Sequence, residues 1–177
     1  GLFQSVTMRT AGFNTIDQLA LTDASKGVGM LLMLIGGAPA GTAGGLKLTT
    51  IFALVWTVYA YVLGGRETVA FHRTIPSEQI RRALTILVGG MLLLFSATIL
   101  LSFIEQGSAC GQLGIWNQLY ETTSAMCTVG VSTGVTAAAG PASRLILMLL
   151  MFIGRVGLLS MAMALVKPQD RVAVRYP

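Results

Sequence analysis

The sequence predicts an all-α membrane protein that contains two copies of a repeated unit. Only 11% of the 177 residues are charged and 54% are hydrophobic, whereas a soluble domain has about 25% charged residues. Apolar runs of the length needed to cross a bilayer recur along the chain. Two polar, glycine-containing strips match each other at one fixed offset. We therefore expect lipid to surround much of this protein.

The formal net charge of +5 does not indicate nucleic-acid binding. The basic residues lie in short gaps between apolar runs, a pattern that reports membrane topology rather than a binding stripe. Cys110 and Cys127 lack metal-ligand spacing, so we expect two free thiols. The chain opens with GLFQSVTMRTAGFNT and shows no signal peptide, which we interpret as the start of a fragment.

Residues 1–65 are expected to form a polar strip followed by one broken membrane crossing. The apolar segment after Lys26 extends to Gly65, which is too long for one straight span at about 1.5 Å per residue. The stretch GGAPAGTAGG, from Gly36 to Gly45, holds five glycines and one proline. Such a composition cannot maintain a regular helix. We therefore predict that the crossing is interrupted there.

The distribution of charge predicts which ends face the cytoplasm. Residues 66–82 contain four arginines and two glutamates, and the tail, residues 167–177, contains one lysine, two arginines and one aspartate. The gap from Glu105 to Gln118 contains no lysine or arginine. By the positive-inside rule, loop 66–82 and the tail are cytoplasmic, and the gap is outside. One broken outside-to-inside crossing in residues 1–65 fits this assignment, whereas two crossings do not.

Residues 83–166 are expected to form a helix, a re-entrant loop and a second helix. The run from Ala83 to Ile104 crosses from inside to outside, and the run from Leu145 to Val166 returns, with Arg155 as its only charge. Both ends of the intervening segment must then lie outside. The segment after Trp116 therefore enters the membrane and comes back. Within it, YETTSAM is typical of one or two helical turns.

An internal repeat relates the two parts of the chain. TAGFNT at Thr10 matches TVGVST at Thr128, an offset of 118 residues, and at that offset MLLMLIGG falls on MLLMFIGR with six of eight positions identical. Two motifs at one ungapped offset indicate two copies of a unit that run in the same direction, which are parallel repeats. The helix that precedes the first copy is expected upstream of Gly1.

The order of helix, short pore helix, Thr-Gly strip and helix is that of a potassium-channel subunit. Irregular backbone at membrane depth is tolerated where it is buried or lines a water-filled cavity, and rings of backbone carbonyls can replace the hydration shell of K+. Gly12 and Gly130 would supply the backbone angles that turn carbonyls inward. We predict that K+ binds to backbone carbonyls of an N-terminal strip, Thr10, Ala11, Gly12, Phe13 and Asn14, and a C-terminal strip, Thr128, Val129, Gly130, Val131 and Ser132.

The motifs SVTMRTAGFNTID, GGAPAGTAGGLK, ETTSAMCTVGVSTG, MFIGRVG and the final RYP resemble the Trk/Ktr/HKT superfamily of cation transporters, particularly bacterial Ktr and Trk membrane subunits. The resemblance covers nearly the whole chain. It implies a pseudo-fourfold arrangement of four repeats around one pore, of which this chain holds about one and two-thirds, the end of the third and nearly all of the fourth. It also implies K+ uptake across the bacterial cytoplasmic (inner) membrane by a multi-pass protein.

The same resemblance implies a gate below the filter. The glycine-rich stretch corresponds to the intramembrane loop of the family, and Arg155 to a pore-facing cation in the last helix. An arginine in mid-span costs about 2.5–3.5 kcal/mol, so it is expected to face the bundle interior or water. Gly37 is its counterpart at the 118-residue offset. The predicted gate residues are Gly36, Gly37, Gly41, Gly44, Gly45 and Arg155, with a purely structural clamp as the alternative for Arg155.

Arg9 and Glu121 are expected to support the filter from behind rather than to bind the ion. Arg9 immediately precedes the N-terminal strip, and Glu121 is expected early in a pore helix, where a negative charge suits the helix N-terminus. The two side chains could also pair with each other across the repeats.

The resemblance implies partners outside this chain. These are a second copy of the complete subunit in a homodimer, the lipid bilayer, and a cytoplasmic RCK/KTN-type nucleotide-binding ring, with loop 66–82 and the tail near Tyr176 as docking surfaces. The chain has no dinucleotide or P-loop motif, so a nucleotide would bind only the partner, and no cofactor is expected here. The transported ion is K+, with Na+ permeation or Na+/K+ cotransport as the alternative.

Three other classes of protein fit the sequence less well. An enzyme does not fit, because the chain has one histidine and no paired carboxylates within a span. A non-conducting membrane anchor would use its glycines for helix packing, but it leaves the two Thr-Gly strips unexplained. A secondary transporter of another kind would lack two further strips in the upstream sequence.

Overall fold

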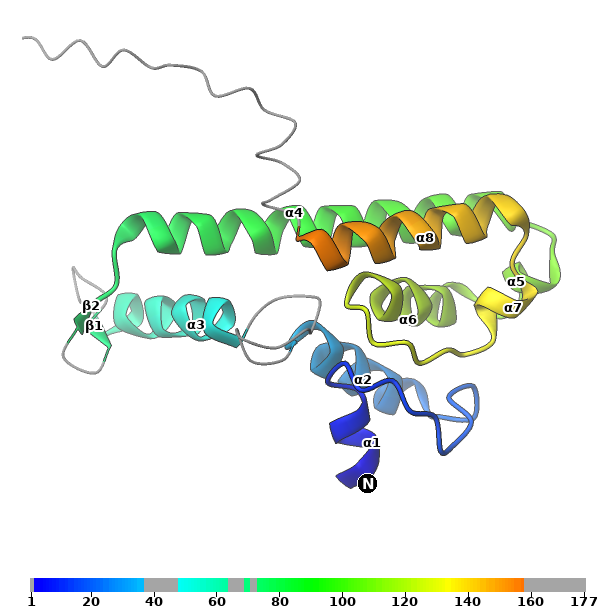
Figure 1. The fold of residues 1–177 in the computed structure, drawn as a ribbon, viewed down its shortest axis with the longest axis horizontal. Coiled ribbons are helices and arrows are strands. Elements are labelled where there is room, and N and C mark those ends of the chain that lie inside the picture. Colours follow the sequence, from blue (N-terminus) through cyan, green and yellow to red (C-terminus); the bar gives the residue numbers. More distant parts are fainter. Residues whose placement is uncertain (1, 37–47, 64–68, 71–72, 158–177) are drawn as a thin grey trace, which may run out of the picture.

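The computed structural model describes residues 2–36, 48–63, 69–70 and 73–157. The regular elements there are helices and one small hairpin (Figure 1). Of the predicted gate residues, Gly37, Gly41, Gly44 and Gly45 lie outside the described residues, as do the tail and the last part of the predicted span from Leu145 to Val166. The elements are α1 (Leu2–Thr7), α2 (Asp23–Leu34), α3 (Leu48–Val62), β1 (Val69–Ala70), β2 (Arg73–Thr74), α4 (Ser77–Ile104), α5 (Ala109–Gln112), α6 (Ile115–Met126), α7 (Val135–Ala138) and α8 (Pro141–Val156).

Helix α4 is the longest of the described helices, and α3, α6 and α8 pack against it. It has 28 residues and, within the described ranges, is the one helix long and apolar enough to cross a membrane. It begins at Ser77, six residues before the predicted start, because Pro76 occupies the N-cap position and the polar first turns extend the helix. Figure 1 shows α3 beside one half of α4, α8 beside the other half, and α6 below that second half.

The two predicted loops lie at opposite ends of α4. The hairpin of β1 and β2, which pairs Val69 with Thr74 and Ala70 with Arg73, lies at the start of α4. Helices α5 and α7 lie at its other end (Figure 1). The hairpin and the gap that begins at Glu105 therefore lie at opposite ends of α4, whereas Arg81 and Arg82 of the predicted loop lie in the first turns of α4 itself. The hairpin itself was not predicted.

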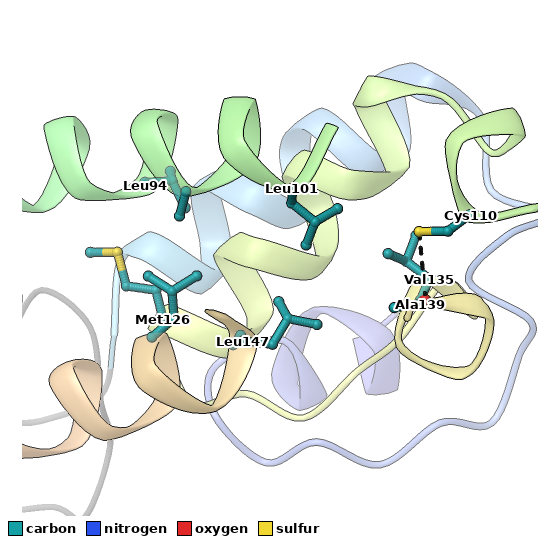
Figure 2. Close-up of a cluster of buried hydrophobic side chains, with 10 residues drawn as sticks. Leu94, Leu101, Cys110, Met126, Val135, Ala139 and Leu147 are labelled. Atoms are coloured by element: carbon teal, nitrogen blue, oxygen red, sulfur yellow. Dashed lines mark hydrogen bonds between the residues drawn. The ribbon is translucent and has the colours of Figure 1, made fainter. Parts of the chain in front are cut away.

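A buried apolar cluster joins α4, α6 and α8. Figure 2 shows Leu94 and Leu101 of α4 near Met126 of α6 and Leu147 of α8. Cys110 and Val135 extend the cluster toward α5 and α7, and both cysteines are free thiols, as predicted. The outward side chains of α3, α4 and α8 are mostly apolar and exposed, which suits contact with lipid rather than water.

Glycine allows α8 to approach α6 closely. A Cβ placed on Gly154 would lie 1.8 Å from the backbone oxygen of Met126, a distance that no side chain can occupy. Its counterpart in the first copy, Gly36, is also buried. Helix α8 therefore contacts the end of α6 through its backbone.

The sequence repeat is also present in the structure. Helix α2 begins at Asp23 and α8 at Pro141, which are 118 residues apart. In each copy a basic side chain in the first turn donates to the carbonyl seven residues earlier: Lys26 Nζ to Leu19 O and Arg144 Nη2 to Ala137 O, both at 3.1 Å. The two pairs are themselves related by the 118-residue offset. The internal correspondence therefore extends from sequence to hydrogen bonding.

Candidate functional site

The two strips adopt the same unusual backbone conformation. Thr10 and Thr128 have φ of +66° and +53°, and Gly12 and Gly130 have φ of +77° and +92°. The threonines are the only two residues other than glycine with positive φ in the described part of the chain. This conformation costs a non-glycine residue about 1–2 kcal/mol. The same strained turn therefore starts both strips, and both glycines occupy positions that exclude ordinary side chains.

Helices α1 and α6 each hydrogen-bond to one carbonyl of a strip. Thr7 Oγ1, at the end of α1, donates to Phe13 O at 2.9 Å, and Ser124 Oγ of α6 donates to Val131 O at 2.6 Å. Phe13 and Val131 are counterparts in the two copies. Because these two carbonyls are directed toward helix hydroxyls, they are the least suited of the predicted ligands to face an ion.

The two strips meet at their glycines. A Cβ on Gly12 would lie 2.2 Å from the backbone oxygen of Val129 and 3.7 Å from the Cα of Gly130. From the other side, a Cβ on Gly130 would lie 3.9 Å from the Cα of Gly12. The two strips, more than a hundred residues apart in sequence, are therefore brought side by side with their backbones in contact.

Glu121 binds the last residue of the C-terminal strip and the residues that follow it. Its side chain is buried, and its carboxylate accepts from Ser132 Oγ at 2.6 Å and from the backbone N–H groups of Thr133 at 2.9 Å and Thr136 at 3.3 Å. The hydroxyls of Thr133 and Thr136 also donate to it. A buried carboxylate requires such compensation.

Two expectations about Glu121 need correction. It lies in the middle of α6, which begins at Ile115, rather than in the first turn, so the helix N-terminus does not account for its charge. Within the described residues its hydrogen bonds come from residues 132–136, and the exposed Arg9 is not among the donors. The pairing of Arg9 with Glu121 across the repeats is therefore not found.

Different side chains support the N-terminal strip. The counterpart of Glu121 there is Phe3, which is exposed. Instead, Gln18 is fully buried, and its Oε1 accepts from Gln4 Nε2 and from the hydroxyl of Tyr120 in α6, both at 2.9 Å. Gln18 Nε2 donates to Ile16 O at 2.8 Å. The residues after this strip are thus attached both to α1 and to the neighbouring pore helix.

Lys26 is a second contact between the copies that the sequence reasoning missed. Its side chain is only 4% exposed, and besides Leu19 O its ammonium donates to Asn117 Oδ1 at 2.8 Å. Its correspondence with Arg144 at the 118-residue offset was the signal that could have identified it. Gln18 and Tyr120 carry no comparable signal, because nothing in a single sequence states which side chains meet between repeats.

Arg155 shares a cavity with the C-terminal strip. The cavity has a volume of about 710 Å³, and its lining includes Thr128, Gly130, Glu121 and Arg155. Arg155 lies in the last turn of α8, immediately after Gly154. Its counterpart Gly37 lies outside the described residues, so the predicted approach of Arg155 to the glycine-rich loop remains a prediction.

Comparison with known proteins gives one consistent result. The TrkH family, described as cation transport proteins, matches residues 1–174. The chain is 37% identical over 175 residues to Ktr system potassium uptake protein B of Bacillus subtilis and 32% identical over 175 residues to the protein of the same name of Vibrio alginolyticus. It is 37% identical over 174 residues to the potassium/sodium uptake protein NtpJ of Enterococcus hirae.

These matches cover 98–99% of this chain but only 37–38% of each relative. The chain thus spans less than two-fifths of the length of the curated relatives it matches, in agreement with the prediction of a fragment. The family consists of transport proteins, in agreement with the prediction that the chain is not an enzyme. The resemblance noted from the motifs is confirmed, and the chain belongs to the TrkH family of cation transport proteins.

Proposed function

We propose that the protein containing this chain takes up K+ across a membrane through a filter lined by backbone carbonyls, and that the chain contributes two neighbouring filter strands. The relatives are named potassium uptake and potassium/sodium uptake proteins, which supports a monovalent cation as the cargo. One helix of α4's length and hydropathy and the apolar exposed faces support a membrane location. The pseudo-fourfold arrangement of four repeats is part of this proposal.

The observation that carries the proposal is the paired geometry of the strips. Both have positive φ at the first and third positions, and they touch at Gly12 and Gly130. A repeated, strained backbone turn at the end of a pore helix is suited to presenting carbonyl oxygens to a common axis. Since the carbonyls of Phe13 and Val131 are bound by hydroxyls, we assign ion coordination to the other carbonyls of the two strips.

The gate is the second part of the proposal. Arg155 lines the cavity beside the C-terminal strip, and a cation on the conduction path opposes the passage of K+ electrostatically. We propose that Arg155 and the loop from Gly36 to Gly45 obstruct the path until the loop moves. In the full-length protein, Arg155→Ala is expected to raise K+ flux under conditions in which the transporter is closed. Flux that is unchanged by this substitution and by deletion of the loop would exclude the gate.

The assembly and orientation are proposals of the same kind. We infer a homodimer of complete subunits in the cytoplasmic membrane, with loop 66–82 and the C-terminus facing the cytoplasm. A nucleotide-binding ring of the RCK/KTN type would dock on that side. The hairpin that carries Arg73 and the helices α5 and α7 lie at opposite ends of α4, which supports this orientation.

Complementation of a bacterium deficient in K+ uptake tests the filter assignment. The complete gene is expressed with and without Gly130→Ser, and growth is measured at low K+. Because φ at Gly130 is +92°, serine is strained there, and relief of that strain would move the carbonyls of the C-terminal strip, so we expect growth to be lost. Gly107→Ser is the matched control, since Gly107 has φ of +88° and nothing within 4 Å of an added Cβ. Growth that ignores Gly130→Ser would contradict the filter assignment.

Na+ transport is the second candidate function, and the name of the Enterococcus hirae relative favours keeping it. Uptake of labelled Na+ by the same cells distinguishes the two. Na+ uptake that equals K+ uptake, or that requires K+, would replace K+ uptake by a Na+-permeable or cotransporting function.

A further inference from the structure

Lys26 occupies a position that is unfavourable for a cation. It is 4% exposed and lies in the first turn of α2, where the positive end of the helix dipole repels an ammonium group. Among the described residues its hydrogen-bond acceptors are Leu19 O and Asn117 Oδ1, which are both uncharged. Burying an ammonium group is unfavourable unless a carboxylate or strong hydrogen bonds compensate for its lost hydration. We therefore ask which function of the protein the buried ammonium group of Lys26 could serve.

Arg144 occupies the corresponding position in the second copy, and its contacts can be compared with those of Lys26. Arg144 makes the equivalent contact with Ala137 O at the same 3.1 Å, but it is exposed. The link from the first turn of the outer helix to the carbonyl seven residues earlier is therefore common to both copies. Lys26 also donates to the other copy, at 2.8 Å to Asn117 Oδ1, and among the described residues Arg144 has no such bond.

Asn117 connects this bond to the C-terminal strip. It lies near the start of α6, and its backbone carbonyl accepts from the hydroxyl of Thr133, the residue directly after the strip. On the other side, Leu19 lies five residues after Asn14, the last residue of the N-terminal strip. Lys26 therefore joins the segment that follows one strip to the pore helix that supports the other.

Two further bonds from α6 cross the same junction: the Tyr120 hydroxyl donates to Gln18 Oε1 at 2.9 Å, and Trp116 Nε1 donates to Asp23 O at 3.3 Å. Helix α6 also packs on α2, where a Cβ on Gly29 would meet Met8 and Tyr120. The junction between the copies thus combines polar bonds with apolar packing. A polar bond of defined length fixes relative position more narrowly than apolar packing does.

We propose that Lys26 is a positioning residue that fixes the distance between the two neighbouring filter strands and so contributes to ion selectivity. The proposal rests on the proposed function of the strips as a filter. A site that discriminates between similar ions depends on the number and placement of its carbonyls. Functional groups must be held to within about 0.5 Å of their working geometry. Lys26 acts through Asn117 and Leu19 and does not contact the ion.

The experiment compares K+ and Na+ uptake by the full-length protein in bacteria that lack their own K+ uptake systems. Lys26→Met retains the length of the side chain and removes the ammonium, and Arg144→Met is the matched control. We expect Lys26→Met to lower the K+:Na+ uptake ratio by roughly threefold to tenfold, the size of effect that a lost hydrogen bond produces. The ratio is expected to stay at the wild-type value in Arg144→Met.

A second variant keeps the proposal testable if Lys26→Met does not reach the membrane. Asn117→Ser shortens the acceptor beyond the reach of Lys26, and we expect it to lower the ratio in the same direction. Asn117→Asp retains the acceptor and is expected to preserve the ratio. Where both single variants are produced, the double variant is expected to show no further change, because the two side chains form one interaction.

Several results would overturn the proposal. An unchanged ratio in Lys26→Met, or in Asn117→Ser where only that variant is produced, excludes a role for the bond in selectivity. If Arg144→Met lowers the K+:Na+ uptake ratio equally, the effect comes from the bond to the carbonyl seven residues earlier, which both copies share. If Gly130→Ser abolishes uptake while the ratio of Lys26→Met is unchanged, the filter stands and the positioning role fails. If Gly130→Ser also has no effect, both proposals fail.

Discussion

Gly12→Ala tests the contact between the two strips. The added Cβ would lie 2.2 Å from the oxygen of Val129, whereas ordinary van der Waals contact begins at 3.4 Å. The obstacle is backbone rather than a flexible side chain, so the strands must separate by about 1.2 Å, the difference between these distances. A carbonyl site tolerates displacements of only about 0.5 Å. The substitution should therefore disrupt ion coordination directly.

The expected effect has two parts that can be separated. The positive φ of Gly12 adds about 1–2 kcal/mol of backbone strain for any L-residue, and that part affects stability. The displacement of about 1 Å affects function, and misplacement of this size in a preorganised site costs up to roughly a hundredfold in rate. We expect initial K+ uptake to fall by at least about tenfold.

The assay is the initial rate of K+ uptake by K+-depleted cells that express the full-length protein, normalised to the amount of protein in the membrane. Gly107→Ala controls for strain, because Gly107 has φ of +88° and open space around an added Cβ. We expect this control to retain wild-type uptake. If Gly12→Ala and Gly107→Ala transport K+ equally well, the close contact of the two strips has no functional importance and the reasoning is wrong.

Three further substitutions, one of them paired with a control, probe buried carboxylates and close helix packing. Glu121→Gln replaces an acceptor of five donors by an amide that cannot accept from all of them; we expect a loss of about 1–3 kcal/mol, measured as a lower apparent melting temperature of the purified protein, and an unchanged temperature would refute the supporting role. The hydrogen bonds of Ser108, Ser143 and Gly140 hold the pKa of Glu105 below its ordinary value of 4.5. The folded state thus favours the charged form, and this stabilisation is complete above pH 4.5 and lost as the pH falls through the lowered pKa. Glu105→Gln should accordingly lower the melting temperature at pH 7 and abolish the pH dependence of the melting temperature in that acidic range. If the melting temperature of the variant depends on pH as strongly as that of the wild type, other carboxylates cause the dependence. Gly154→Ala is expected to destabilise the protein by at least about 1–3 kcal/mol through overpacking, whereas Gly27→Ala, with 3.7 Å to its nearest neighbour, is expected to be neutral or stabilising in a thermal assay of both variants.

The features set by local patterning could be predicted from the sequence. The apolar run of α4, the polar strips and the offset of 118 residues depend on the order of residue types along the chain, and each is found in the structure. Gly12 and Gly130 could be identified because a repeated glycine at one position of two matching motifs signals a backbone requirement. Positive φ at Thr10 and Thr128 could not, because threonine carries no such signal.

The features set by contacts between the copies could not be predicted. Helix α6 begins at Ile115, well before the predicted turns. Its first residues resemble the preceding polar gap in composition, so the sequence does not mark them as helical. They become helical because α6 packs between α2, α4 and α8. The burial of Lys26 and Gln18 likewise depends on which side chains of α6 face them. Helices α5 and α7 have four residues each, too few for any periodic pattern to show.

The composition of α6 has a consequence for how the protein enters the membrane. Eight of its twelve residues are buried, and they include the charged Glu121 and a run of three hydroxyl residues, Thr122, Thr123 and Ser124. Such a segment is too polar to partition into lipid by itself. Its environment is provided by α4, which is synthesised before it, and α8, which is synthesised after it. The burial of α6 between them can therefore be completed only after α8 has been translated.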